Sequence, residues 1–82
     1  MYITSEQHTR LVRGLFDKMI ELRKAQERHI KTYEIAFQGV IEEVFPNKCW
    51  YDVTGCNIFM HLMTHKDPLA TVIAILKELK ED

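Results

Sequence analysis

Apolar residues recur at helical spacing through most of the first half of the chain. The segment 5–45 contains no proline or asparagine, and its apolar residues follow one another in steps of one, three or four with a single gap in the middle. This stripe consists of Val12, Leu15, Phe16, Met19, Leu22, Ile30, Tyr33, Phe37, Val40, Ile41 and Val44. Thr4 and Gln7 have the spacing of a capping box, and Pro46 disfavours the α conformation at Phe45. The pattern predicts one long helix over about 5–45.

A continuous helix of this length is too long for one small chain to cover. At 1.5 Å per residue it spans roughly 60 Å, whereas a compact domain of this size is roughly 30 Å across. Either the helix breaks near residues 23–31, where Gln26 and His29 interrupt the stripe, or a second copy of the protein covers it. Residues 23–31 are mostly strong helix formers and include no Gly, Asn, Asp or Pro. We therefore expect a continuous helix in a homodimer, with a helical hairpin as the alternative.

Gln26 and His29 allow two interpretations within the continuous helix. They belong either to a solvated midsection or to a buried polar layer that fixes the register of a helix pair. His29 has no cysteine, serine or carboxylate three or four residues away, so a catalytic role for it is not favoured.

Two shorter helices are predicted in the second half of the chain. Thr54 can cap a helix over about 55–65, and Asp67 followed by Pro68 is a typical start for a helix over about 68–80. The apolar residues that support them are Ile58, Phe59, Leu62 and Met63 in the first, and Leu69, Val72, Ile73, Leu76 and Leu79 in the second. A buried strand over 70–76 is the alternative for the last segment, because these residues are rich in β-branched side chains. The fold class expected is all-α, with residues 1–82 forming a single helical domain.

Composition and charge narrow the classes of protein. The chain has 46% hydrophobic and 28% charged residues, which is typical of a globular protein. Its net charge of −1 divides into +3 over residues 1–31 (seven Lys and Arg, four acids) and −4 over residues 32–82 (four Lys and Arg, eight acids). No apolar run approaches the roughly 20 residues of a membrane span, the start of the sequence is polar, and there are only two cysteines. We expect a cytoplasmic protein that does not bind membranes.

The segment 49–65 contains two cysteines and two histidines, which raises the possibility of a zinc site. His61 and His65 lie one turn apart, about 40° from each other around a helix, and Cys49 in the preceding loop could join them. Cys56 lies about 140° from His61, on a different face of the helix. We therefore expect no bound metal, with a site formed by Cys49, His61 and His65 as the alternative.

Enzymatic activity is not favoured by any motif. The sequence has three glycines in total, no glycine-rich phosphate loop, no nucleophile and base at a typical spacing, and no Glu-x-x-His pair. We expect no enzymatic activity and no cofactor.

Basic residues in the first half of the chain suggest nucleic acid as an alternative partner. The residues that would contact it are Arg10, Arg13, Arg23, Lys24 and Arg28. Acidic residues are interleaved with them, and the sequence pI is about 6.4, whereas nucleic-acid-binding domains are usually basic.

The remaining class is a small protein-binding module that acts as a regulator, adaptor or inhibitor. The adjacent aromatic residues Trp50 and Tyr51 lie in the loop before the second helix, and aromatic residues of this kind dominate protein-binding hot spots. Trp50 and Tyr51 are therefore the expected partner-binding residues. Because neighbouring residues of an extended segment point in opposite directions, we expect Tyr51 to contact the protein partner directly and Trp50 to fold back onto the core.

Overall fold

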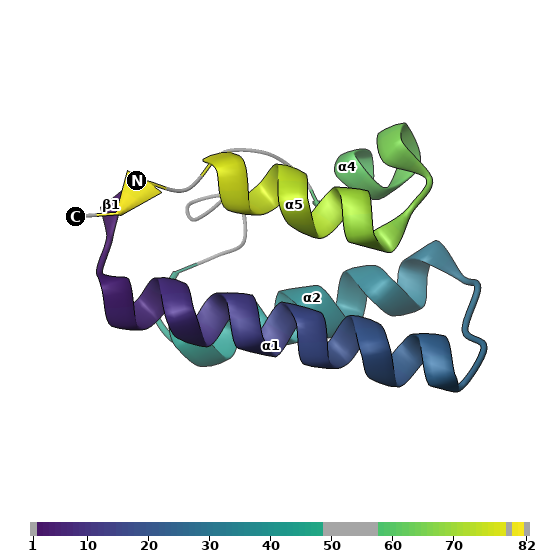
Figure 1. Ribbon diagram of the computed structural model, residues 1–82, viewed down its shortest axis with the longest axis horizontal. Coiled ribbons are helices and arrows are strands. Elements are labelled where there is room, and N and C mark those ends of the chain that lie inside the picture. Colours follow the sequence, from purple (N-terminus) through teal and green to yellow (C-terminus); the bar gives the residue numbers. More distant parts are fainter. Residues whose placement is uncertain (1, 49–57, 79, 82) are drawn as a thin grey trace.

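The computed structural model describes residues 2–48, 58–78 and 80–81. These residues form four helices, α1 (Ser5–Lys24), α2 (Ile30–Val44), α4 (Ile58–His65) and α5 (Pro68–Glu78), and two short strands, β1 (Tyr2–Ile3) and β2 (Lys80–Glu81). Figure 1 shows α1 and α2 as an antiparallel helical hairpin, and α4 and α5 as a second helical hairpin joined by a short turn. α5 packs against α1, and α4 packs against α2. Apart from the strand pair, the regular structure of the described residues is helical, which confirms the all-α fold class.

The prediction of one continuous helix over 5–45 is wrong, and the hairpin alternative is confirmed. α1 ends at Lys24 and α2 begins at Ile30, so the chain reverses direction within the predicted break region. Gln26 adopts the left-handed conformation, with φ at 58°. The N–H of Gln26 donates to the carbonyl of Arg23 at 3.0 Å, and the N–H of Glu27 donates to the carbonyl of Leu22 at 2.9 Å. These two bonds form a Schellman motif, which ends a helix without a glycine here.

The side chain of Glu27 fixes the remainder of this turn. Its Oε1 accepts hydrogen bonds from the backbone N–H groups of Arg28 at 3.1 Å and His29 at 2.9 Å. The hydroxyl of Tyr33 donates to the carbonyl of Glu27 at 3.0 Å. Gln26 and His29 are both exposed, so the buried polar layer is wrong. The two residues are solvated, but they lie between two helices and not in the middle of one.

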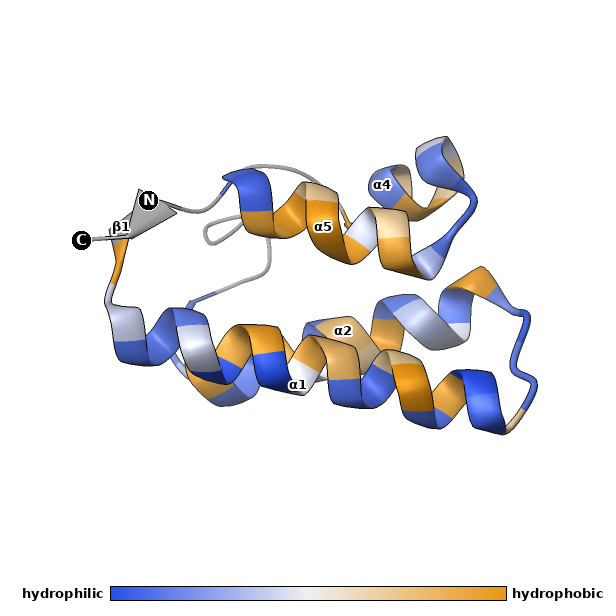
Figure 2. Ribbon diagram, in the orientation of Figure 1, coloured by the Kyte–Doolittle hydropathy of each residue, from blue (hydrophilic) through white to orange (hydrophobic). Residues whose placement is uncertain are grey.

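Folding back buries the apolar stripe within a single chain. The core contains residues of every described helix and of β1: Ile3, Leu11, Leu15, Met19, Tyr33, Phe37, Val40, Ile41, Val44, Phe45, Ile58, Leu62, Val72 and Ile75. Figure 2 shows hydrophobic and hydrophilic residues alternating along α1 and α2, as in amphipathic helices. The reason for expecting a homodimer therefore no longer applies, and the homodimer itself stays a prediction.

Helices α1 and α2 are in close contact at Gly14. A Cβ atom at this position would lie 2.6 Å from Cγ1 of Val40, which is well inside van der Waals contact. The absence of a side chain at Gly14 thus allows Val40 to pack directly on the backbone of α1. Gly39 differs, because a Cβ atom there would have nothing within 4 Å.

The ends of the helices agree with the capping signals in the sequence. Thr4 and Gln7 form the capping box of α1, with both hydrogen bonds present at 3.0 and 3.1 Å. Asp67 caps α5 by accepting from the N–H of Leu69 at 3.1 Å. Residues 70–76 are helical, so the strand alternative for them is wrong. None of the helices within the described residues is long and apolar enough to cross a bilayer.

Boundaries in the second half differ slightly from the prediction. α4 ends at His65 as expected, whereas its predicted beginning near 55 lies outside the described residues. α5 ends at Glu78 instead of continuing to 80, and the chain then forms β2. β2 pairs in parallel with β1, in the register Tyr2 to Lys80 and Ile3 to Glu81, which brings the two ends of the chain together (Figure 1).

Candidate functional site

The α1–α2 turn and the α4–α5 turn lie at the same end of the molecule (Figure 1). Residues of both turns line a cleft. This turn cleft has a volume of about 220 Å³. It is lined by the α1–α2 turn, the first residues of α2, the end of α4 and the beginning of α5. The lining residues are Glu27, Arg28, Ile30, Tyr33, Leu62, Lys66, Asp67 and Pro68.

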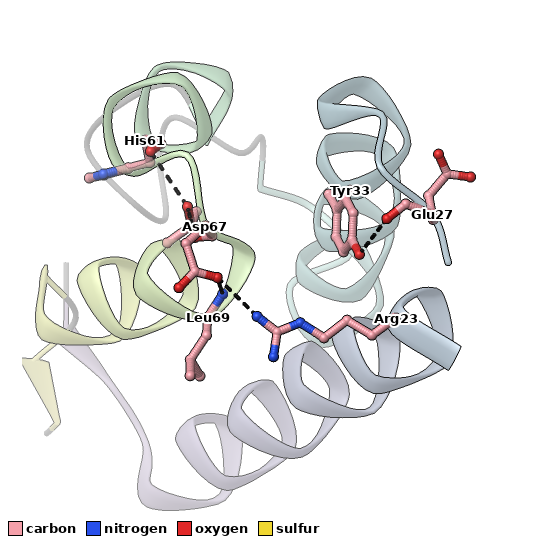
Figure 3. A network of polar contacts seen from close by, with 7 residues as sticks. Arg23, Glu27, Tyr33, His61, Asp67 and Leu69 are labelled. Carbon is pink, nitrogen blue, oxygen red and sulfur yellow. Dashed lines mark hydrogen bonds and ion pairs between the residues drawn. The ribbon is translucent and has the colours of Figure 1, made fainter. Parts of the chain in front are cut away.

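Two polar contacts hold the walls of the turn cleft in place. Nη2 of Arg23 lies 2.9 Å from Oδ1 of Asp67, so the end of α1 is bound to the beginning of α5. On the other wall, the hydroxyl of Tyr33 donates a hydrogen bond to the backbone carbonyl of Glu27. Figure 3 shows Arg23 extended toward Asp67 and the Tyr33 hydroxyl directed at Glu27. The cleft is therefore bounded by turns that hydrogen bonds fix in position.

The floor of the turn cleft is apolar and its rim is charged. Tyr33 and Leu62 are buried, and Ile30 and Pro68 are half-buried. The Tyr33 ring also packs against Phe37, with the ring centroids 6.1 Å apart. Among the residues that the structure describes, the lining includes no Ser, Thr, Cys or His side chain, so these residues offer none of the usual nucleophiles or histidine bases.

The turn stabilises the ionised form of Glu27 and lowers the pKa of its carboxyl. The N–H of His29 is the main cause of a pKa below the usual value of 4.5, followed by the His29 ring, whose Nδ1 lies 2.8 Å from Oε1. The N–H of Arg28 adds to this effect, while partial desolvation opposes it. The carboxylate is thus used to stabilise the turn and the beginning of α2.

A second surface of interest is the α4 face, which consists of Phe59, Met60 and Met63. These side chains are 36%, 61% and 47% exposed, although they are large and apolar. The sequence pattern groups Phe59 and Met63 with Ile58 and Leu62, but the structure separates the two pairs. Ile58 and Leu62 are buried, whereas the α4 face points away from the core.

The structure places the two histidines of the alternative zinc site together. The rings of His61 and His65 are stacked, with centroids 5.9 Å apart and planes inclined by 10°. Nε2 of His61 lies 3.3 Å from Oε1 of Glu78. Cys49 lies outside the described residues, and within residues 2–48, 58–78 and 80–81 no group of three or more His, Cys, Asp or Glu side chains is arranged to hold a metal ion.

The basic residues proposed for nucleic acid do not form one surface. Arg10 and Arg13 lie together beside a shallow hollow, but its lining also contains Asp17 and Glu43. Arg23 is paired with Asp67, and Arg28 belongs to the turn cleft at the other end of α1. Lys24 is exposed in the last turn of α1. This arrangement does not favour the nucleic-acid alternative, which stays untested.

No family model, curated protein or solved structure matches this chain in comparisons with known proteins. The turn cleft and the α4 face are therefore the basis for inferring function. Of the residues that line the turn cleft, sequence reasoning proposed only Arg28 as a binding residue, and for nucleic acid. It grouped Phe59 and Met63 with the core. The predicted partner-binding residues Trp50 and Tyr51 lie outside the described residues.

Proposed function

We propose that this protein is a small non-enzymatic protein-binding module, acting as a regulator, adaptor or inhibitor in the cytoplasm. The single observation that supports this proposal most strongly is the exposure of Met60 and Met63 on one side of α4. Phe59 borders them, and Ile58–His65 contains no Asp, Glu, Lys or Arg. A short helix with an uncharged, exposed methionine surface is suited to packing against an apolar groove of another protein.

The residue types of the α4 face fit this role. Methionine is unbranched and polarisable, so it can adapt its shape to irregular apolar surfaces, and it is common in protein-binding surfaces. An aromatic residue beside it supplies a large contact area with few rotatable bonds. Trp50 and Tyr51 stay proposed partner-binding residues, and in the sequence they precede α4 by fewer than ten positions.

Site-specific photo-crosslinking tests the proposal. We would replace Met60 with the photoreactive residue p-benzoylphenylalanine, and in a matched control place it at Glu42, an exposed position on α2. In cell extract, position 60 should give a protein adduct of defined mass that is absent from position 42. Excess wild-type protein should prevent this adduct, whereas a folded Met60→Lys, Met63→Lys variant should not. Identical adducts at positions 60 and 42 would show that the α4 face is not a binding surface.

The homodimer remains a proposal, with the α4 face as its contact surface in place of the first-helix stripe. Because α4 has no charged side chain, a two-fold symmetric contact through it would place no like charges opposite each other. Light scattering after size exclusion should then give about twice the 9.7 kDa of the chain. The Met60→Lys, Met63→Lys variant should be monomeric, and a monomeric wild-type protein would exclude the homodimer.

A further inference from the structure

The size of the turn cleft restricts what can bind in it. Pockets for cofactors and drug-sized molecules have volumes of roughly 300–1,000 Å³. The turn cleft, at about 220 Å³, is smaller and suits one large side chain instead. Its floor, with Ile30, Tyr33 and Leu62, would contact the apolar part of such a side chain.

The charges at the rim favour an acidic ligand. The two carboxylates of the lining are already engaged, Glu27 with the backbone and ring of His29 and Asp67 with Arg23 and the N–H of Leu69. The two cations of the lining, Arg28 and Lys66, are exposed, and neither forms an ion pair with any residue that the structure describes. With Asp67 paired to Arg23, the lining keeps two cations, Arg28 and Lys66, against one carboxylate, Glu27, whose Oε1 is held by the turn, so the remaining charge of the lining is positive by one.

The backbone holds both cations at the rim from opposite sides. Arg28 belongs to the α1–α2 turn, where its N–H donates to Glu27. Lys66 belongs to the α4–α5 turn, with φ at 56° and its N–H donating to the carbonyl of Leu62 at 2.9 Å. The ion pair between Arg23 and Asp67 links the two turns. A ligand lying in the cleft can therefore meet a cation on either side of an apolar floor.

We propose that the turn cleft binds an acidic peptide segment of a protein partner. One bulky apolar side chain of the segment occupies the floor, and the neighbouring carboxylates pair with Arg28 and Lys66. This inference rests on the proposed function, because the acidic segment is taken to be part of a protein partner. It concerns a surface separate from the α4 face, and it specifies the chemistry of the partner.

Titration of the ¹⁵N-labelled protein with short blocked peptides tests this inference by NMR. The probe is acetyl-Glu-Phe-Glu-amide, and the matched peptides are acetyl-Gln-Phe-Gln-amide and acetyl-Glu-Ala-Glu-amide. The acidic aromatic peptide should shift the amide signals of Arg28, Tyr33 and Lys66. It should bind about five-fold more tightly than the Gln peptide, since two exposed ion pairs together contribute about that factor. The Ala peptide should bind more weakly as well, because it leaves the floor empty.

Variants establish which residues carry the selectivity. The Arg28→Gln, Lys66→Gln variant should lose the preference for the acidic peptide. The control variant, Lys24→Gln, Lys31→Gln, should retain this preference. The control removes the same amount of charge from nearby exposed positions. Equal binding of the Glu and Gln peptides by the wild type would overturn the inference. Inorganic phosphate that shifts the same signals with equal affinity would also overturn it, because the site would then recognise an anion alone.

The peptide titration and the photo-crosslinking experiment test the two surfaces independently. Peptide binding should be unchanged in the Met60→Lys, Met63→Lys variant, which alters only the α4 face. Peptide binding without an adduct at position 60 would support the turn cleft and contradict the α4 face. An adduct at position 60 without peptide binding would contradict the turn cleft alone.

Discussion

Arg23 and Asp67 lie 44 residues apart in the sequence, and their side chains meet at 2.9 Å. Oδ1 of Asp67 accepts from the guanidinium of Arg23 and also from the N–H of Leu69 in the first turn of α5. One carboxylate oxygen therefore both caps α5 and joins the two helical hairpins. It also fixes one wall of the turn cleft.

Removal of the two partners should have unequal effects on stability. Both side chains are about half exposed, so the ion pair contributes at most about 1 kcal/mol and Arg23→Ala should lower the free energy of unfolding by no more than that. Asp67→Ala removes the helix cap as well, which is typically worth a further ~1 kcal/mol. Asp67→Asn keeps a capping side chain and should fall between the two. Urea denaturation followed by circular dichroism measures this order, and equal losses for Arg23→Ala and Asp67→Ala would contradict it.

The two helical glycines should respond oppositely to alanine. Gly14→Ala places a methyl group against Val40 and should destabilise the protein by about 1–3 kcal/mol through overpacking. Gly39→Ala meets open space and should stabilise it by about 0.5–1 kcal/mol, because alanine favours the helix. Thermal unfolding compares the two variants directly. Stabilisation by both would mean that α1 and α2 are not in close contact at Gly14.

Glycine at position 26 should stabilise the α1–α2 turn. Gln26 has a positive φ, which disfavours side chains with a Cβ atom by roughly 1–2 kcal/mol, whereas glycine adopts it readily. Gln26→Gly should therefore raise the melting temperature, and the control Gln26→Ala should not. If Gln26→Gly lowers it, the turn does not have this conformation in solution.

Acid should weaken the α1–α2 turn through Glu27. Because the folded state lowers the pKa of this carboxyl, mainly through the His29 N–H, its ionisation stabilises the folded protein above the unfolded pKa. This stabilisation should be complete above that value, near 4.5, and should be lost as the pH falls through the folded pKa. The wild type should therefore lose its advantage over Glu27→Gln as the pH falls through this range. Urea denaturation at a series of pH values measures the difference in the free energy of unfolding between the two proteins. A difference that stays constant with pH would contradict the contact between Glu27 and His29.

Zinc binding should be absent despite the stacked histidines. The ring of His61 is within 3.3 Å of Glu78, and the described residues supply no third ligand of suitable position. Native mass spectrometry should therefore give the mass of the chain without metal. One zinc ion per chain, lost in a His61→Ala, His65→Ala variant, would establish the site with Cys49 as the remaining candidate ligand.

Features that depend on neighbouring residues along the chain could be predicted from the amino-acid pattern. The capping box at Thr4 and Gln7 and the cap at Asp67 are formed by residues two or three positions apart, and both were predictable. The helical periodicity likewise predicted the core residues of α2, and Leu15 and Met19 of α1. It missed Leu11, which is buried, and included Val12, which is half-buried. Each of these features is stabilised within one or two turns of helix, so that the rest of the molecule is not needed to specify it.

The gap in the apolar stripe indicated where the long helical pattern could break, near residues 23–31, but tertiary contacts determine that it does break there. The helix formers of residues 23–31 favour continuation locally, and Gln26 adopts an unfavourable φ in the turn. The break is stabilised by distant contacts, namely the packing of α2 on Gly14 and the burial of Tyr33 in the core. These contacts form only when the chain folds back, so no local signal indicates them.

The candidate sites depend on tertiary structure for the same reason. Periodicity places Phe59 and Met63 on the apolar side of α4, but the packing of α4 against α2 and α5 buries Ile58 and Leu62 and leaves Phe59 and Met63 at the surface. The turn cleft brings together two turns almost 40 positions apart. A sequence fixes which residues are near each other along a helix, whereas the burial of the core decides which turns meet in space.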